Sequence, residues 1–401
     1  MNEGRSEENA PYMIGLFNDN FPPVLDGVAL TVQNYAYWLH MKGENVRVIT
    51  PYAPHARDFI DSLPYPVDRY TSVPIPMRKP YRYGLPEIDL NFKRKLGKQP
   101  FDLVHAHCPF TSGTLARHLA KKRHIPIVAT FHSKYRQDFE RAIPSTYIVN
   151  SLIKDIVKFY EKVDEVWIPQ AAVEPTLREY GFKGSVEVVE NGNDFYTPAH
   201  LIKPMREEMR AELGVMPDEM MLLFVGQHIW EKNIGLILDS LALIKEQPWQ
   251  LFMVGTGYAV RDIRTKIAEL GLSSKVTLLG NILDRERLKR VDAAADLFLF
   301  PSLYDNAPLV VREAAALHTP AVMISGSTAA EVIRDKDNGF LTVNDPHEYA
   351  NLVKYLIEHK AEVERVGLRA SLTLTRSWED IIDEVQLRYK DIINRYHLLH
   401  G

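Results

Sequence analysis

Residues 296–325, which read DLFLFPSLYDNAPLVVREAAALHTPAVMIS, hold two short apolar runs separated by a polar loop and an amphipathic stretch. The runs at 296–301 and 320–325 are each bounded by a proline, as buried strands commonly are. Two strands joined through a helix pair in parallel, because a parallel connection has to cross the face of the sheet. The segment therefore predicts a β–α–β unit with helices on both faces of its sheet.

The same pattern recurs along the rest of the chain. Further strands are predicted at 12–17, 45–50, 102–107, 126–131, 165–169 and 186–191 in the first half, and at 221–226, 250–255, 275–280 and 339–343 in the second. Helices are predicted at about 27–41, 84–97, 111–123, 145–161 and 170–180, and after each strand of the second half.

This alternation predicts an α/β protein with two doubly wound Rossmann-like domains, residues 10–196 and 197–379, facing each other across a cleft. The polar, proline-containing start of the second domain, residues 197–219, is interpreted as a linker. An amphipathic pattern at 377–399 predicts a terminal helix, and we expect residues 380–401 to pack back onto the first domain. Its apolar positions are Ile381, Ile382, Val385, Leu387, Tyr389, Ile392 and Ile393.

The composition is that of a soluble globular protein, with 401 residues, 46% hydrophobic and 25% charged. It excludes a disordered, collagen-like or coiled-coil chain, and the net charge of −4 argues against a nucleic-acid partner. The single cysteine, Cys108, excludes a disulfide framework, and we interpret it as a packed side chain, with a nucleophile as the alternative. The N-terminus is unlike a secretion signal and no apolar run is long enough to span a membrane, so we expect a cytoplasmic protein.

Two turns between a strand and a helix are candidate sites for a phosphate. After the first strand, Asp26 and Gly27 open a helix, and a glycine there lets a ligand approach the backbone N–H groups. The alternative is a plain helix cap made by Asp26. In the second half, Gly226 ends a strand and Lys232 lies where the next helix starts, within reach of a diphosphate or, alternatively, in solvent.

Two further turns carry glycines or carboxylates. Gly255 begins a glycine-rich turn that lacks the third glycine of a dinucleotide fingerprint, which disfavours a nicotinamide or flavin enzyme. In the turn at 300–313, Asp305 and Glu313 flank a helix start at Pro308, where free N–H groups favour a phosphate. The two carboxylates suit the vicinal hydroxyls of a sugar and a ribose. Because Glu313 precedes a small, apolar helix that we expect to be buried, it needs a partner.

Taken in order, these turns resemble the GT-B glycosyltransferases, and within them the large retaining family 4. The resemblance covers nearly the whole chain. It is carried by the acidic pair Asp305-x7-Glu313, by Asp26-Gly27, by the turn from Gly226 to Lys232, by Thr130-Phe131-His132, and by the loop Val189-Glu190-Asn191-Gly192-Asn193-Asp194.

The resemblance implies a nucleotide-sugar donor, expected to be a UDP-hexose, and no metal or other cofactor. Glu313 would bind the ribose hydroxyls, Asp305 the sugar hydroxyls, and Lys232 with the helix start after Pro308 the diphosphate. The catalytic residues implied are Lys232, Asp305 and His132. The donor-binding set is completed by Gly27, Gly226, Gln227, Gly255, Asn306, Pro308, Leu309 and Val310, and the acceptor-side set is Asp26, His107, His132, Lys134 and Arg136.

Two residues depart from the family pattern. Gln227 stands where the family usually has an arginine, which removes one positive charge from the leaving group. Asp305 replaces the usual first glutamate and is shorter by one methylene group. In the front-face mechanism proposed for such enzymes, the leaving phosphate oxygen takes the acceptor's proton and the anomeric configuration is retained, so no pair of glycosidase-type carboxylates is expected.

His105 and His107 occupy alternate positions of a predicted strand, so both should face the same side. Such a pair could begin a metal site, but no third ligand is evident, and we expect both to line the site or pack at the strand end.

The acceptor is expected to be a lipid. Residues 77–98 contain seven basic and two acidic side chains interleaved with Tyr81, Tyr83, Leu85 and Phe92, a candidate surface for an anionic membrane, with a solvated loop and helix as the alternative. The segments FPPVLDGVALTV (21–32) and HCPFTSG (107–113) look like those of diacylglycerol glucosyltransferases. We therefore expect transfer of a hexose to a lipid such as diacylglycerol, at the inner face of the cell membrane. The alternatives are a sugar-nucleotide-binding pseudoenzyme and a GT-B-like epimerase.

Overall fold

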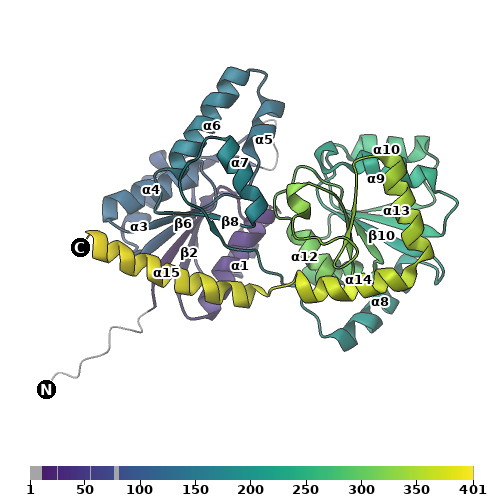
Figure 1. Cartoon of the computed structure of the whole chain (residues 1–401). Coiled ribbons are helices and arrows are strands. Elements are labelled where there is room, and N and C mark those ends of the chain that lie inside the picture. Colours follow the sequence, from purple (N-terminus) through teal and green to yellow (C-terminus); the bar gives the residue numbers. More distant parts are fainter. Residues whose placement is uncertain (1–10, 25, 55, 76–80, 401) are drawn as a thin grey trace. The chain divides into compact units, whose positions relative to one another are not determined.

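The computed structural model describes residues 11–24, 26–54, 56–75 and 81–400. Its contacts divide the chain into two compact units (Figure 1). The first unit is Met1–Asn191 together with Trp378–Gly401, and the second unit is Gly192–Ser377. Each unit has its own parallel sheet and its own buried apolar core.

The first unit contains a seven-stranded parallel sheet in the order β3-β2-β1-β6-β7-β8-β9. A separate antiparallel hairpin joins β4 (Ser72–Pro74) and β5 (Arg82–Gly84). The sheet strands are β1 (Met13–Phe17), β2 (Asn45–Pro51), β3 (Val67–Tyr70), β6 (Leu103–Ala106), β7 (Ile127–Thr130), β8 (Glu165–Ile168) and β9 (Glu187–Val188).

Helices cover both faces of this sheet. On one face, α1 contacts the C-terminal helix α15, while α3, α4 and α6 contribute to the apolar core on the other. The helices of this unit are α1 (Gly27–Met41), α2 (Arg57–Asp61), α3 (Leu90–Gly97), α4 (Thr111–Arg123), α5 (Tyr135–Ala142), α6 (Thr146–Tyr160), α7 (Glu174–Glu179) and α15 (Trp378–His400), with 3₁₀ turns at Pro86–Ile88 and Ala171–Val173.

The second unit has a six-stranded parallel sheet in the order β12-β11-β10-β13-β14-β15. Its strands are β10 (Met220–Val225), β11 (Trp249–Val254), β12 (Val276–Gly280), β13 (Leu297–Leu299), β14 (Ala321–Ile324) and β15 (Phe340–Thr342). Numbered within each sheet, the first six strands of both sheets follow the order 3-2-1-4-5-6 of the Rossmann fold, and the first sheet has β9 as a seventh strand at its edge. This order confirms the predicted fold class. In this order the first and fourth strands are neighbours, and the connections that follow them lead to opposite edges of the sheet.

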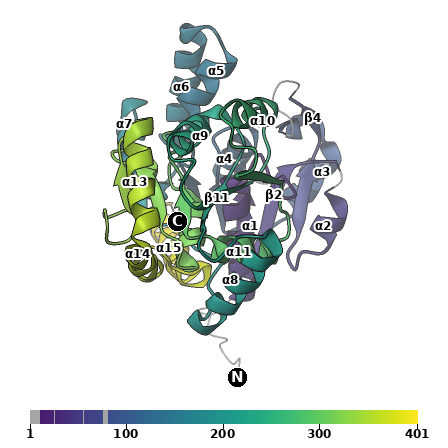
Figure 2. The same ribbon diagram turned by 90° about the vertical axis from the view of Figure 1, so that its right-hand side faces the viewer.

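Two groups of helices enclose the second sheet (Figure 2). On one side of the sheet, α9 contacts both α10 and α13. On the other side, α11 contacts both α8 and α12, and α12 also contacts α14. The helices are α8 (Ala199–Leu213), α9 (Ile234–Leu243), α10 (Val260–Glu269), α11 (Arg285–Ala294), α12 (Leu309–Ala316), α13 (Pro346–Glu358) and α14 (Lys360–Thr373), with 3₁₀ turns at Trp230–Lys232 and Thr328–Ala330.

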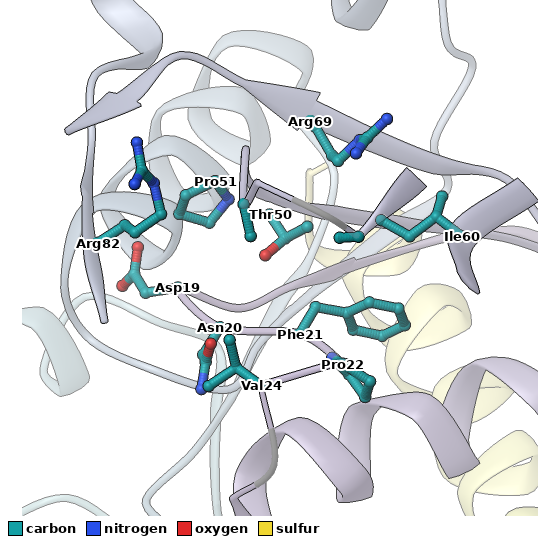
Figure 3. A pocket seen from close by; sticks show the side chains of 12 residues that line it. Asp19, Asn20, Phe21, Pro22, Val24, Thr50, Pro51, Ile60, Arg69 and Arg82 are labelled. Carbon is teal, nitrogen blue, oxygen red and sulfur yellow. The ribbon is translucent and has the colours of Figure 1, made fainter. Parts of the chain in front are cut away.

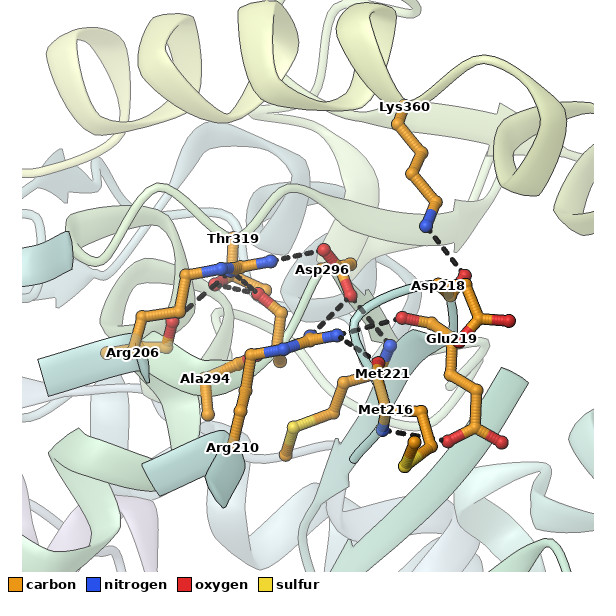
Figure 4. Close-up of polar contacts among 12 residues, drawn as sticks. Arg206, Arg210, Met216, Asp218, Glu219, Met221, Ala294, Asp296, Thr319 and Lys360 are labelled. Atoms are coloured by element: carbon orange, nitrogen blue, oxygen red, sulfur yellow. Dashed lines mark hydrogen bonds and ion pairs between the residues drawn. The ribbon is translucent and has the colours of Figure 1, made fainter. Parts of the chain in front are cut away.

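The predicted linker at 197–219 is wrong, because most of it forms α8 despite Pro204 inside the helix. Contacts with residues distant in the sequence stabilise this helix. The guanidinium groups of Arg206 and Arg210 both pair with the carboxylate of Asp296, which also accepts a 2.6 Å hydrogen bond from the Met221 amide (Figure 4). This network lies at the amino ends of β10 and β13, away from the strand ends at which such sheets bind ligands.

The long terminal helix is confirmed, and its apolar side packs on the first unit. Six of the seven predicted apolar positions are buried, whereas Leu387 is exposed. Strand β3 was missed because its sequence, VDRY, carries two charges: Asp68 is buried and pairs with Arg47 at 2.8 Å. The predicted helix at 84–97 is correct only from Leu90, since Pro86 begins a 3₁₀ turn before it.

Candidate active site

The candidate donor site lies where β10 and β13 end side by side in the second unit. The chain leaves β10 through Gly226 and reaches Lys232 in the turn before α9, and it leaves β13 through Phe300 and reaches Asp305 before α12. The ammonium group of Lys232 and the carboxylate of Asp305 form an ion pair between these two loops, and both side chains are more than four-fifths buried. The topology thus brings together two of the three predicted catalytic residues.

The Lys232 ammonium also lies over two aromatic rings, 5.7 Å from the centre of Phe300 and 5.5 Å from that of Tyr304. Because the faces of aromatic rings attract cations, these contacts help to hold the Lys232 ammonium group between the two loops. Asn233 follows in the left-handed conformation, with φ of 60°, and its side-chain amide donates to the Pro301 carbonyl at 3.2 Å. The cation is therefore held by residues of the loop after β13, and Asn233 joins the two loops.

Asp305 retains capacity to accept hydrogen bonds. Its Oδ2 atom is buried and has no hydrogen-bond partner among the described residues. Beyond it, Pro308 precedes α12 and gives no side-chain cap to the helix start, where Leu309 and Val310 begin the first turn. A helix start of this kind attracts an anion, while a carboxylate oxygen accepts hydroxyl groups. The neighbouring Asn306 is also buried.

Glu313, further along α12, is buried and does have the partner that its setting requires. Its Oε1 accepts a 2.7 Å hydrogen bond from the Arg285 guanidinium, which also binds Asp194 at 2.7 Å and lies 4.3 Å from the centre of the Phe195 ring. Burial raises the pKa of Glu313, and Arg285 opposes that rise. Arg285 was not predicted from the sequence, although it stands at the start of α11 just after β12, at another strand-to-helix turn.

A second buried carboxyl group, that of Asp292 on α11, also feels the charge of Glu313. Burial, and then Glu313, raise its pKa well above the ordinary value, while Arg285 lowers it. Neither carboxyl oxygen has a hydrogen-bond partner among the residues described. Burial therefore favours the neutral form of the Asp292 carboxyl group, which reduces the negative charge around Glu313.

The glycines beside this site serve loop packing. A Cβ atom on Gly255 would lie 2.0 Å from the Gly226 carbonyl oxygen, and one on Gly257 would lie 2.4 Å from that of His228. These glycines therefore let the loops after β10 and β11 lie against each other. Gln227 is exposed.

The histidines predicted from alternation lie in the first unit. His105 and His107 stack with ring centres 4.1 Å apart, on the side of α1 and α15. His105 contacts the Tyr389 hydroxyl at 2.6 Å and the Thr130 hydroxyl at 2.7 Å, and His107 contacts His132 at 3.1 Å through their ring nitrogens. Burial lowers the pKa of all three, that of His132 to about 3, so they are neutral at pH 7.

Across the residues that the structure describes, no group of three or more His, Cys, Asp or Glu side chains is arranged to hold a metal ion.

Asp19, which was not predicted from the sequence, lies where β1 and β6 end side by side. Its carboxyl group accepts hydrogen bonds from the Cys108 thiol at 2.8 Å and from the Ser112 amide at 2.9 Å. Burial raises the pKa of both Asp19 and Cys108. Because the reactive form of a cysteine is the thiolate, the raised pKa supports the interpretation of Cys108 as a packed side chain.

Asp19 also lines a small hollow of the first unit (Figure 3). Around it lie Asn20, Thr50, Arg69 and Arg82, with apolar side chains completing the wall. Figure 3 shows the Thr50 side chain near the middle of this group, and its buried hydroxyl has no hydrogen-bond partner in the described part of the chain. The hollow therefore carries mixed polar groups at the carboxyl ends of β1 and β2.

The other predicted first-unit residues have local roles. Asp26 caps α1 by accepting from the Ala29 amide at 2.7 Å, whereas Gly27 is exposed and a Cβ atom there would meet open space. Arg136 ties α5 to α6 by donating to the Asn150 side chain at 2.9 Å. Lys134 is half-buried at the start of α5.

Two family models match the chain, "Glycosyltransferase Family 4" over residues 25–195 and "Glycosyl transferases group 1" over residues 205–372. The chain belongs to glycosyltransferase family 4. Among the relatives of this glycosyltransferase is the alpha-monoglucosyldiacylglycerol synthase of Streptococcus pneumoniae, 26% identical over 85% of this chain and 77% of that protein. The synthase of the same name from Acholeplasma laidlawii is 26% identical over 88% of this chain and 89% of that protein.

Solved GT-B glycosyltransferases share the fold of this glycosyltransferase. Anabaena HepE in complex with UDP and glucose matches 95% of this chain and 100% of its own with a TM-score of 0.76 and 18% identity. The sucrose-phosphate synthase of Thermosynechococcus elongatus matches 96% of this chain and 100% of its own with a TM-score of 0.80 and 21% identity. In the part of the chain that is described, no helix has both the length and the apolar character needed to cross a membrane.

Proposed function

We propose that this glycosyltransferase moves a hexose from a UDP-hexose to a hydroxyl group of a diacylglycerol-type lipid, with retention of anomeric configuration and without a metal ion. The observation that carries the proposal is the Lys232–Asp305 ion pair beside the start of α12. It combines a fixed cation and a helix N-terminus, which suit a diphosphate, with a carboxylate that suits sugar hydroxyls.

In the proposed reaction, the bond between the anomeric carbon and the β-phosphate oxygen breaks, and the acceptor oxygen forms the new bond on the same face of the sugar. The acceptor's proton passes to the leaving phosphate oxygen, which departs as UDP. Lys232 and the N–H groups at Leu309 and Val310 stabilise the negative charge that develops on the diphosphate. Asp305 holds the sugar hydroxyls, and Glu313, oriented by Arg285, holds those of the ribose. His132 is assigned to the sugar as a neutral hydrogen-bond partner, consistent with its lowered pKa.

The acceptor class rests on the relatives named as glucosyldiacylglycerol synthases. We propose contact with the inner membrane surface through residues 77–98, of which residues 77–80, with the cations Arg78 and Lys79, lie outside the described residues. Several cations of this segment are engaged within the protein: Lys93 pairs with Glu87 at 2.8 Å and Lys95 with Asp68 at 2.5 Å. Among residues 81–98, the large apolar side chains that are exposed are Tyr83, Ile88 and Leu90.

The test of transfer uses the purified chain with UDP-glucose, diacylglycerol in mixed micelles, and EDTA. We expect UDP release that depends on the acceptor, a glucosylated lipid by mass spectrometry, and an α-anomeric proton signal by NMR. Binding of UDP-glucose without release would support a pseudoenzyme, and an isomerised donor would support the epimerase. Loss of transfer in EDTA, restored by Mg²⁺, would contradict metal independence.

The membrane contact is tested separately by sedimentation with phosphatidylglycerol vesicles over a salt series. The double substitution Lys93→Gln and Arg94→Gln should weaken binding if residues 77–98 face the membrane. Binding that is insensitive to salt and to these substitutions would remove this surface from the proposal.

A further inference from the structure

A groove with an apolar floor lies between α4, α5 and α6 of the first unit, outside the site described above. Its volume is about 320 Å³. The floor is apolar, with Ile156 and Phe159 buried and Leu152 and Phe139 partly buried. A molecule of liquid water takes up about 30 Å³, close to the volume of one methylene group, so the groove has room for a chain of roughly ten methylenes.

The apolar floor continues beyond the groove along α6. Ile148, Leu152, Ile156 and Phe159 recur at intervals of four, four and three residues, which places them on the same side of a helix. Ile148 is 48% exposed and the adjacent Tyr147 is 84% exposed. Large apolar side chains left in water at the end of an apolar groove indicate a surface that contacts apolar material.

Three cations line the groove. Arg117 of α4 and Lys158 and Lys162 of α6 and its C-terminal end line it, against a single carboxylate, Asp155, which pairs with Lys158 at 2.9 Å. The lining therefore carries a net charge of +2 in a protein of net charge −4. An apolar floor with a cationic border matches an amphiphile that has an acyl chain and an anionic headgroup.

The groove adjoins the predicted acceptor side. Pro109 and Phe110 line it and directly follow Cys108 and His107 at the end of β6. The Phe110 ring lies 5.3 Å from that of Tyr135 and 6.2 Å from that of Phe139, centre to centre. The loop that carries His107 thus leads into one wall of the groove, and α5, which follows His132, forms another.

We propose that this groove binds an acyl chain of a bilayer lipid, with the anionic headgroup at Arg117, Lys158 and Lys162. The bound chain anchors the first unit on the membrane and, given the proposed function, holds the lipid acceptor near His107 and His132. Binding of the chain itself does not depend on glycosyl transfer.

The first experiment measures sedimentation of the full-length protein with vesicles of phosphatidylglycerol and phosphatidylcholine. The double variant Lys158→Gln and Lys162→Gln should bind about thirtyfold more weakly, because each basic residue near an anionic surface contributes a factor of about five. The matched control is Lys121→Gln with Lys122→Gln, two exposed cations of α4 that do not line the groove, with an expected loss below about threefold. Equal losses in the two pairs would overturn the proposal.

The second experiment measures occupation of the groove with cis-parinaric acid, a fluorescent fatty acid. Leu152→Gln should weaken its binding at least about fivefold, as the polar replacement of an apolar contact does, whereas Leu387→Gln on the exposed side of α15 should not. No binding by the unaltered protein, or equal binding by both variants, would overturn the proposal. Circular dichroism checks folding, and if Leu152→Gln unfolds the protein, the exposed lysine pair decides the outcome.

Neither readout involves glycosyl transfer. Fatty-acid binding without glucosylation would contradict the proposed function and leave the groove standing. Glucosylation of a short-chain acceptor without fatty-acid binding would support the proposed function and contradict the proposed role of the groove.

Discussion

The two units place different chemistry at the same topological point. Where the first and fourth strands of the second unit end, a lysine and an aspartate form an ion pair in contact with two aromatic rings. Where the corresponding strands of the first unit end, Asp19 instead accepts hydrogen bonds from a thiol and an amide, and burial raises its pKa. The fold fixes where such residues meet, and the residue types decide which chemistry the position carries.

The largest effect is expected at the charged end of this comparison. Lys232→Gln should lower kcat by about a thousandfold, as removal of a fixed group that stabilises an oxyanion does. The control is Lys266→Gln, which removes a lysine that pairs with Asp239 at 2.7 Å elsewhere in the same unit. Steady-state kinetics with UDP-glucose measures both, and a loss below tenfold for Lys232→Gln would place the leaving group elsewhere.

Arg285→Gln tests whether the Arg285–Glu313 pair of the second unit serves donor binding as well as stability. Without Arg285, Glu313 is left buried beside Asp194 with no cation, so the free energy of unfolding should fall by about 3 kcal/mol and the KM for the donor should rise about tenfold. Asp296→Asn is the control, since it weakens the network with Arg206 and Arg210 at the opposite strand ends. It should lower stability with little change in KM, whereas equal changes in KM would show that the Arg285 effect is general destabilisation.

Acid should affect the first unit through its three histidines. Folding keeps them neutral, with the pKa of His132 lowered to about 3, whereas in the unfolded chain they take up protons below about pH 6.5. Stability should therefore fall as the pH drops below 6.5, by up to about 1.4 kcal/mol per pH unit for each histidine. Urea unfolding at pH 7.5 and 5.5 measures this, and His107→Gln should reduce the pH dependence. An unchanged dependence would show that His107 is not held neutral by folding.

The smallest effect is expected at Asp19 in the first unit. Asp19→Asn keeps the shape of a side chain whose carboxyl group burial already favours in its neutral form, so stability should fall by only about 1 kcal/mol. The same substitution at Asp305 removes the charge beside Lys232 and should reduce kcat/KM about a hundredfold. If the two substitutions had similar effects on kcat/KM, the contrast between the two positions would be wrong.

Much of the fold follows from local pattern. Apolar runs bounded by proline and glycine predicted the buried strands. Strands that are covered on both faces have apolar side chains on both faces, so their sequences are almost continuously apolar. The pattern failed where charge was buried by pairing, as in β3, and where a proline-containing segment became helical, as in α8. In both cases the stabilising partner lies far away in the sequence: Asp68 meets Arg47, and Arg206 meets Asp296.

Local sequence was enough to predict most of the sheet strands and their alternation with helices, and to place Lys232, Asp305 and Glu313 at strand-to-helix turns. Those features depend on neighbouring residues and on the spacing of apolar side chains. Only the tertiary structure decided which side chains meet. Lys232 and Asp305 are 73 positions apart, Asp19 and Cys108 are 89 apart, and Arg285 was not predicted as the partner of Glu313. The physical reason is that a parallel sheet aligns the ends of strands that are distant in sequence, so contacts between their loops are set by strand order.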